Sequence, residues 1–364
     1  MSKTNYKRLG DYIREVDVRN RNLKVTKLLG LSMTKQFRPS TSNIVGVDLS
    51  KYKVVDKNVF AFDPMSVIRV HKVPIALNSD NLPIIVSPAY TTFKSIDENI
   101  LDARYLMMWF RRNEFDRYAD FKSDASVRGG YNWNELCETQ IILPPIDQQR
   151  KIVAEYNAIQ QRIKLNEQLI VKLEETAQTI YRKMFVDGID KNNLPEGWRM
   201  GTLEEIAEVN SGKTCKNKSV QQTETYLWPI AGASGIIGYS QIYNQDMSFI
   251  TIGRVGTLGV VNRYNGKVFC ADNVLIIKSQ YYEYCYQILR SIDYNEIVKG
   301  GVQSLITQTD LKGMDVLIPN EYTLSLFEQQ SSHIFHQCKL KKTGNLYLHK
   351  LQSLLLVKMG KYKQ

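Results

Sequence analysis

The segment SGKT (211–214) has residue types that could bind the phosphates of a nucleotide. In a phosphate-binding loop, backbone amides and a lysine surround the phosphates, and a further glycine stands five positions before the glycine that precedes the lysine. Here that position holds Ala207, within a segment (203–209) that the sequence predicts to be a short helix. We therefore expect no nucleotide-binding loop and interpret Lys213 as an exposed basic loop residue.

Two further segments, GASGIIG (232–238) and GRVGTLG (253–259), each space three glycines at three-residue intervals. A dinucleotide-binding turn has the spacing G-x-G-x-x-G and opens a helix, and neither segment does so. Tight turns between strands explain these glycines. The alternative is a nucleic-acid contact, in which the turns bring backbone amides and Arg254 close to a phosphate backbone.

No catalytic or metal-binding constellation is recognisable in the sequence. The segment SPAY (87–90) has alanine where the [DNS]-P-P-[YF] loop of an amine methyltransferase has its second proline. The motifs G-x-S-x-G, H-E-x-x-H and D-x-[DN]-x-[DN]-G do not occur. Five scattered cysteines and four histidines show neither zinc nor disulfide spacing. We expect a recognition or scaffold protein, with an enzyme of unfamiliar motif as the alternative.

The net charge of +11 favours a polyanionic partner, although solubility alone would also explain it. Residues 1–143 carry a net charge of +6 and residues 320–364 a net charge of +5, and seven lysines but no acid follow residue 338. No apolar run approaches the ~20 residues of a membrane span, and the first residues lack an apolar signal segment. These features predict a cytoplasmic protein without a membrane partner.

Basic and amide side chains near predicted loops form the candidate DNA contacts, because Arg, Lys and Gln bind phosphates and base edges. For any one of them, ordinary surface solvation remains the simpler interpretation. In the first half they are Lys35, Arg38, Arg111, Arg112, Arg117, Lys122 and Arg128, and in the second half Lys213, Lys216, Lys218, Arg254, Lys299 and Gln303.

The chain contains an internal repeat with an offset of 175 residues. Without a gap, this offset pairs Leu136 with Leu311 and Pro144 with Pro319, and it continues to Met184 and Met359. Upstream, the glycine pair at 129–130 corresponds to the pair at 300–301. Each half is therefore predicted to be a globular segment followed by one long helix.

Apolar residues in both predicted helices recur every 3.5 residues on average, the period of a coiled coil. The first helix is expected over 147–187, between an N-cap at Asp147 and a stop at Gly188, and the second is expected to weaken or bend at Gly344. The seam residues are Ile152, Ile159, Ile163, Asn166, Ile170, Leu173 and Ile180, followed by Phe327, Ile334, Leu348 and Leu355. We expect an antiparallel pair of helices.

Segments rich in Val, Ile and Phe predict the strands of the globular halves. The fold class is α+β: two mixed α/β domains separated by a long antiparallel two-helix coiled coil, with a pseudo-twofold repeat. The expected boundaries are 1–143 and 195–319 for the globular domains, with helical regions at 144–190 and 320–364. Predicted strands cover 43–49, 66–73, 81–87, 89–95, 248–253, 259–264 and 267–279, and predicted helices cover 102–115 and 281–297.

Over essentially its whole length the chain resembles the specificity (S) subunit of a type I restriction-modification system. The resemblance lies in the order of two variable domains, each followed by a long helix. Two segments depart from the family's usual form, since Asp147–Gln149 stands near its Glu-Gln pair and Gly344 interrupts the second helix. The segments that carry the resemblance are ILPPIDQQRKIVAEY (142–156), KLEETAQTIYRKMF (172–185), LPEGWRMGTLEEIAEVNSGKT (194–214), GRVGTLG (253–259) and GGVQSLITQTDLKGMDVLIP (300–319).

This resemblance implies a non-catalytic subunit that recognises a bipartite sequence in double-stranded DNA. The two globular segments would be target-recognition domains, and the helices would set the spacing between the half-sites. Two DNA-methyltransferase (M) subunits and motor-nuclease (R) subunits would be the partners, carrying S-adenosylmethionine, ATP and Mg, so that this chain binds no cofactor. The alternative is a scaffold or dimerisation protein that never binds DNA.

Overall fold

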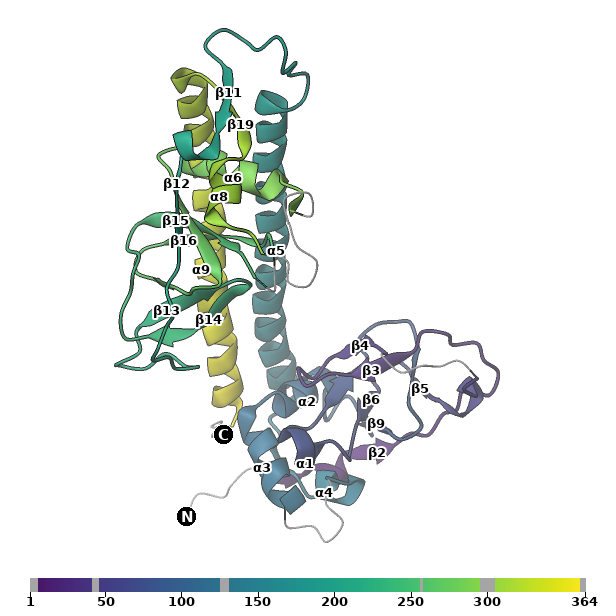
Figure 1. The fold of residues 1–364 in the computed structure, drawn as a ribbon. Coiled ribbons are helices and arrows are strands. Elements are labelled where there is room, and N and C mark those ends of the chain that lie inside the picture. The colour runs from purple at the N-terminus through teal and green to yellow at the C-terminus, as the bar shows by residue number, and fades with distance from the viewer. Residues whose placement is uncertain (1–5, 41–45, 125–130, 256–257, 295–304, 361–364) are drawn as a thin grey trace. The chain divides into compact units, whose positions relative to one another are not determined.

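A computed structural model of the protein describes residues 6–40, 46–124, 131–255, 258–294 and 305–360 (Figure 1). The chain divides into two compact units, which are described separately. Unit 1 comprises residues 1–165 and 344–364, and unit 2 comprises residues 166–343. Two long helices, α5 (Ile146–Phe185) and α9 (Glu321–Met359), each contribute one part to both units.

Unit 1 contains short antiparallel strands and four helices besides its parts of α5 and α9, counted over its described residues. Its largest sheet has the order β2-β9-β6-β7, and β1-β10, β3-β4 and β5-β8 form pairs. The strands are β1 (Tyr6–Arg8), β2 (Ile13–Glu15), β3 (Leu29–Leu31), β4 (Phe37–Pro39), β5 (Lys53–Val55), β6 (Phe60–Phe62), β7 (Ile75–Leu77), β8 (Ile84–Val86), β9 (Thr91–Ser95) and β10 (Gln140–Ile142). The helices are α1 (Val67–Val70), α2 (Ala103–Phe110), α3 (Asn113–Asp124) and α4 (Trp133–Cys137), with 3-10 turns η1 (Leu9–Asp11) and η2 (Leu49–Lys51).

An aromatic cluster fills the main core of unit 1. The rings of Phe60 and Phe93 stack with centroids 4.7 Å apart, and Phe110 of α2 meets Phe60 edge-on at 5.7 Å. All three side chains are fully buried, which stabilises the fold by about 2–3 kcal/mol each. Ile152 of α5 and Met359 of α9 belong to the same cluster, so the start of one long helix and the end of the other complete this core.

Unit 2 is built around a four-stranded sheet of order β12-β18-β15-β16, with β14-β13-β17 and β11-β19 as smaller sheets. All its pairings are antiparallel except that of β13 with β17. The strands are β11 (Arg199–Thr202), β12 (Glu208–Ser211), β13 (Trp228–Gly232), β14 (Gly235–Ser240), β15 (Ser248–Gly253), β16 (Val261–Asn265), β17 (Phe269–Cys270), β18 (Val274–Lys278) and β19 (Asp315–Ile318). The helices are α6 (Tyr282–Ser291) and α8 (Gln308–Lys312), with a 3-10 turn η3 (Leu203–Glu205).

The core of unit 2 also includes both long helices. Phe185 of α5 packs against Tyr284 of α6 at 4.8 Å and against Phe327 of α9 at 5.3 Å. Here the end of α5 therefore meets the beginning of α9. Together with the opposite arrangement in unit 1, these contacts show that the two helices run antiparallel.

The internal repeat is present at the level of elements. In each unit the first strand pairs with the strand that precedes a long helix: β1 with β10, and β11 with β19. A 3-10 turn follows that first strand in both cases. The short helices α4 and α8 both begin with a capping box, from Asn132 and Thr307. Leu136 and Leu311, which the 175-residue offset pairs, are both fully buried.

The predicted seam residues of α5 are buried or half-buried, and the predicted start of the helix is wrong. Ile152, Ile163, Asn166 and Ile170 are buried along α5, as the 3.5-residue period requires. Helix α5 begins at Ile146, so Asp147 lies in its first turn and is not the N-cap. The remaining predicted seam residues of α5 are half-buried: Ile159, Leu173 and Ile180.

Helix α9 continues through Gly344, so the expected weak point is not a break. Its seam holds the same register as that of α5 but buries polar residues at several levels. Phe327 is fully buried, whereas Ile334, Leu348 and Leu355 are half-buried. The buried polar residues of the seam are Ser331, Asn345 and Gln352.

Several predictions for the globular halves are wrong in detail. Segment 66–73 was predicted to be a strand but contains α1, because Ser66 accepts backbone bonds from residues 69 and 70 and starts a helical turn. Segment 203–209 is a 3-10 turn that leads into β12 instead of a helix. The predicted strand 267–279 divides into β17 and β18, and the predicted helix 102–115 divides into α2 and α3. Residues 43–45 and 295–297 lie outside the described residues.

Candidate nucleic-acid interface

The segment SGKT forms a loop that is fastened to the strand ends of unit 2. Backbone hydrogen bonds join Gly212 N to Val274 O (3.1 Å) and Lys213 N to Cys270 O (3.0 Å). A Cβ atom at Gly212 would lie 1.8 Å from Ala271 O, so only glycine permits this approach. The loop follows β12 and precedes no helix, which confirms that it is not a nucleotide-binding loop of the usual kind. It leaves Lys213 exposed.

Arg254, from the glycine-rich segment 253–259, meets this loop. Its Nη1 donates to Ser211 Oγ at 3.2 Å, and its backbone N donates to Asn273 O at 3.1 Å. Gln308 Nε2 donates to the same Ser211 Oγ at 2.7 Å. Two segments that the sequence singled out separately thus come together around one hydroxyl group, with Lys216 and Lys218 exposed in the continuing loop.

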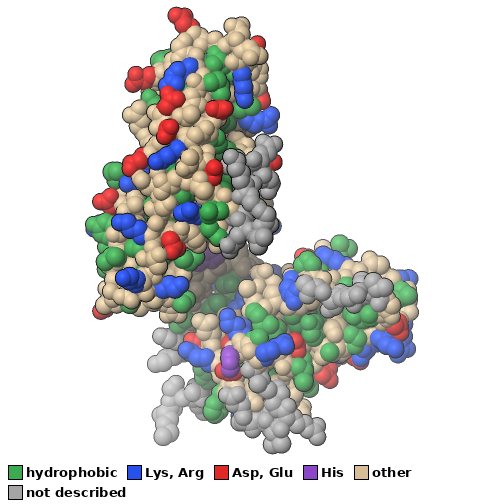
Figure 2. Space-filling model, viewed as in Figure 1, with side chains coloured by type: hydrophobic (Ala, Val, Ile, Leu, Met, Phe, Trp, Pro, Cys, Tyr) green, Lys and Arg blue, Asp and Glu red, His purple; other side chains and the backbone are tan. Residues whose placement is uncertain are grey.

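The exposed candidates in unit 1 are dispersed over several elements. Arg38, on β4, donates to Leu31 O at 3.1 Å. Arg117, on α3, keeps 76% of its side chain exposed and has an ion pair with Glu114 at 3.6 Å. Lys122 is exposed on the same helix, and the half-buried Arg111 lies over the ring of Tyr156. On the face shown in Figure 2, basic and acidic side chains are interspersed, with no large area of one sign.

Two of the predicted DNA-contact residues, Lys35 and Arg112, have side chains that are largely buried. Lys35 is 5% exposed, and its Nζ lies 2.6 Å from Asp116 Oδ1 and over the ring of Phe115. Burial lowers the pKa of Lys35, against the opposing effect of Asp116. The Arg112 side chain is 10% exposed and stacks on Trp109 at 4.2 Å. Both side chains are therefore packed within unit 1 and are not exposed basic residues. Arg128, Lys299 and Gln303 lie outside the described residues.

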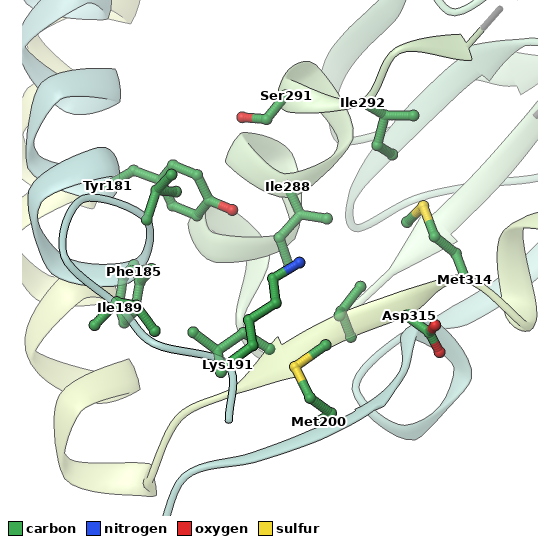
Figure 3. Close-up of a pocket in the computed structure, with 13 residues that line it drawn as sticks. Tyr181, Phe185, Ile189, Lys191, Met200, Ile288, Ser291, Ile292, Met314 and Asp315 are labelled. Atoms are coloured by element: carbon green, nitrogen blue, oxygen red, sulfur yellow. The ribbon is translucent and has the colours of Figure 1, made fainter. Parts of the chain in front are cut away.

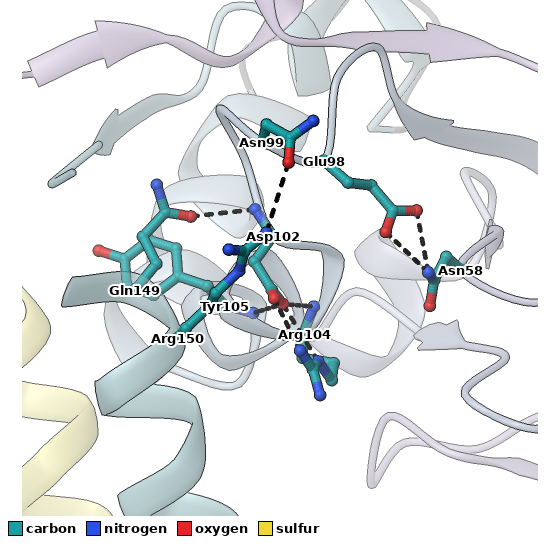
Figure 4. A network of polar contacts seen from close by, with 8 residues as sticks. All are labelled: Asn58, Glu98, Asn99, Asp102, Arg104, Tyr105, Gln149 and Arg150. Atoms are coloured by element: carbon teal, nitrogen blue, oxygen red, sulfur yellow. Dashed lines mark hydrogen bonds and ion pairs between the residues drawn. The ribbon is translucent and has the colours of Figure 1, made fainter. Parts of the chain in front are cut away.

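Sequence reasoning missed two long-helix side chains that hold the recognition segments in place. Gln149 of α5 is fully buried, and its Oε1 accepts from Asp102 N at 3.0 Å (Figure 4). Its Nε2 donates to Ile100 O and Pro144 O, both at 2.8 Å. Glu328 of α9 accepts from the backbone N of Glu283 (3.0 Å) and Tyr284 (2.8 Å). Each therefore joins its long helix to the start of a domain helix, α2 or α6. For Gln149 the available signal was a polar residue one step before Ile152 in the apolar period, whereas Glu328 lies outside the seam and had no such signal.

A cavity of about 310 Å³ in unit 2 lies between the end of α5, α6 and the β11-β19 pair. Most of its lining is apolar, with Phe185 and Ile288 among it, but Lys191, Ser291 and Asp315 also line it. Lys191 extends across it toward α6 (Figure 3). Across the described residues, no group of three or more His, Cys, Asp or Glu side chains could hold a metal ion.

The class of protein follows from comparison with known families. Residues 195–345 match the family described as the type I restriction modification DNA specificity domain. The chain is therefore similar to that family over this segment. The segment covers the described elements of unit 2 from β11 onward and the first part of α9.

Two individual proteins are similar to the chain. The type I restriction enzyme EcoprrI specificity subunit of Escherichia coli is 24% identical over 136 residues, which is 36% of this chain. The match spans about a third (34%) of the length of that curated relative. The crystal structure of a type I restriction-modification S subunit from M. genitalium has the same fold, with a TM-score of 0.59 and 14% identity over 97% of this chain and 95% of that one.

Proposed function

We propose that the chain is the DNA-specificity subunit of a type I restriction-modification complex and recognises a bipartite DNA sequence. The observation that carries this proposal is the match of residues 195–345 to the DNA specificity domain, because residues 6–142 share with it the paired first and last strands, the 3-10 turn and the capped short helix. One chain thus contains two related modules, which suits a target with two halves.

In this proposal, residues 1–143 and 195–319 each bind one half-site in the major groove. Regions 144–190 and 320–364 form the antiparallel helices that fix the length of the spacer. The exposed candidates Arg38, Arg117, Lys122, Lys213, Lys216 and Lys218 neutralise phosphates, which supplies salt-dependent affinity without sequence preference. Lys35 is excluded because it is buried and paired.

The chemistry of modification and cleavage belongs to partner chains. Two methyltransferase subunits would bring S-adenosylmethionine, and motor-nuclease subunits would bring ATP and Mg. This chain would direct them to the DNA, in the cytoplasm, without a catalytic residue or cofactor of its own. No described helix is long and apolar enough to cross a membrane.

Single-molecule sequencing of methylated DNA tests the proposal. Cells with the complete system are compared with cells that lack only this chain, and we expect a bipartite methylated motif that depends on the chain. Exchange of residues 1–143 for a homologous domain should change one half of that motif. An unchanged methylation pattern, together with no salt-sensitive binding of DNA duplexes by the assembly, would support a scaffold that never binds DNA.

A further inference from the structure

The hydroxyl group of Ser211 lies at the centre of a cluster of hydrogen-bond donors in unit 2. Its Oγ accepts from Arg254 Nη1 (3.2 Å) and from Gln308 Nε2 (2.7 Å). A serine hydroxyl has two lone pairs and one proton. Both lone pairs are therefore used, and the only hydrogen bond that Ser211 can still offer is a donated one.

The neighbouring side chains also present donors. Arg254 has a guanidinium group with five N–H bonds and no acceptor, and Lys213 has an exposed ammonium group. The amide nitrogen of Gln308 has a second proton besides the one it gives to Ser211. No ion pair joins Arg254 or Lys213 to an acid within the described residues, and the nearby Asp272 accepts from Thr214 Oγ1 at 2.7 Å.

The backbone holds this cluster in a fixed position. Arg254 N donates to Asn273 O, and Ile306 N donates to Arg254 O, both at 3.1 Å. Gly212 brings the loop against Ala271, and Lys213 N is bonded to Cys270 O. Arg254 Nε is buried and has no partner among the described residues. Arg254 is thus half-buried, and hydrogen bonds fix both its backbone and its Nη1 atom. Lys216 and Lys218 are instead exposed.

We propose that Ser211, Lys213, Arg254 and Gln308 form a binding site for one phosphate group of the DNA backbone. This inference rests on the proposed function, because it assigns residues to the DNA contact of unit 2. A phosphodiester presents only acceptor oxygens and a negative charge, which match two cations and two neutral donors. A base edge in the major groove presents donors as well as acceptors on most base pairs, and so matches an all-donor cluster less well.

The test measures binding of mixed-sequence DNA duplexes to the full chain by fluorescence anisotropy between about 50 and 200 mM salt. The double variant Arg254→Ala, Lys213→Ala should lower the slope of log affinity against log salt by about 0.9, the value for one phosphate charge, and each single variant should lower it by a part of that amount. Ser211→Ala leaves the charge unchanged but releases Arg254, so affinity should fall several-fold with a nearly unchanged slope. Lys183→Ala, an exposed lysine on α5, is the charge-matched control and should keep the wild-type slope.

Three results would overturn the inference. If both Arg254→Ala and Lys213→Ala kept the wild-type salt slope, the proposed phosphate contact would be contradicted, whereas the proposed function would not. Loss of only the methylated motif, with unchanged binding of mixed duplexes, would make Arg254 a base contact. Arg254-dependent binding of inorganic phosphate without an effect on DNA would indicate a free-anion site. Failure of the wild-type chain to bind any duplex would instead contradict the proposed function.

Discussion

Single side chains of the long helices hold the starts of the domain helices α2 and α6. The side-chain amide of Gln149 forms hydrogen bonds with three backbone groups. The carboxylate of Glu328 accepts hydrogen bonds from two backbone N–H groups at the start of α6. Tyr281, which precedes α6, has no side-chain bond to that turn, so the cap comes from another element. In α2 the cap is the local Asp102, and Gln149 holds the cap residue.

Replacement of Gln149 by alanine should lower the free energy of unfolding by about 2–4 kcal/mol, because it leaves buried backbone groups without partners. Chemical denaturation of the full chain measures this loss. Gln148→Ala is the matched control, since Gln148 is the adjacent residue and is only half-buried. Equal stabilities of the two variants would show that the bonds of Gln149 contribute nothing beyond those of a surface glutamine.

Glu283 should make the stability of the protein decrease as the pH rises. Burial raises the pKa of Glu283 to about 7, with Glu328 adding to the rise and Arg263 opposing it. The unfolded chain releases this proton near its ordinary pKa of 4.5, whereas the folded protein keeps it to about 7. The folded state therefore loses stability between these pH values, on the order of 2–3 kcal/mol in total.

Glu283→Gln should remove that dependence, so the difference in unfolding free energy between wild type and variant should change across pH 4.5–7. Denaturant titrations at several pH values measure it. The exposed Glu204→Gln variant serves as the control. A constant difference between wild type and Glu283→Gln at all pH values would show that Glu283 titrates alike in the folded and unfolded states.

The elements that the sequence predicted best are those with strong local periodicity. Helix α5 and the strands β9 and β15 follow directly from apolar spacing, because neighbours along the chain decide them. The cluster around Ser211 could be predicted only in part. Its loops were recognisable from their glycines, but Gln308 reaches Ser211 across 97 residues, and no local pattern encodes that contact. The prediction that Lys35 is an exposed basic residue was wrong for the same reason, since its partner Asp116 is 81 residues away.

Gly344 provides a prediction about helix α9. A Cβ atom there would meet no atom within 4 Å, and the residue lies inside a continuous helix. Gly344→Ala should therefore stabilise the protein by about 1 kcal/mol. Gly188→Ala is the opposite control, because Gly188 has φ +78 and also has open space, so alanine there is strained and destabilising. Thermal unfolding distinguishes them, and a lower melting temperature for Gly344→Ala would contradict the prediction.

For the whole molecule, the register of the long helices defines how a spacing experiment must be built. Cys338 Sγ contacts Ile170 O at 4.0 Å, and Asn345 Nδ2 contacts Ile163 O at 3.4 Å. Seven residues forward along α5 thus correspond to seven residues backward along α9. A change of length in one helix alone would break this register, so both must change together.

Removal of residues 163–169 together with 339–345 should shorten the helix pair by about 10 Å and keep its seam in phase. If the pair sets the spacer, the methylated motif should keep both half-sites with about three fewer base pairs between them. Removal of 163–169 alone is the control and should abolish a stable fold. A doubly shortened, folded protein with an unchanged spacer would refute the role of the helices in spacing.

The burial of Met359 in the core of unit 1 has a consequence for synthesis on the ribosome. Met359 is 1% exposed in a core that otherwise comes from residues 9–156, and Leu356 packs against the same core. At about 5–20 residues per second, roughly 10–40 seconds separate the emergence of β10 from that of Met359. Throughout this interval the nascent unit 1 exposes apolar surface that α9 later covers. Unit 1 is thus begun before unit 2 but completed after it, and a chain that stops before α9 exposes this surface to chaperones and aggregation.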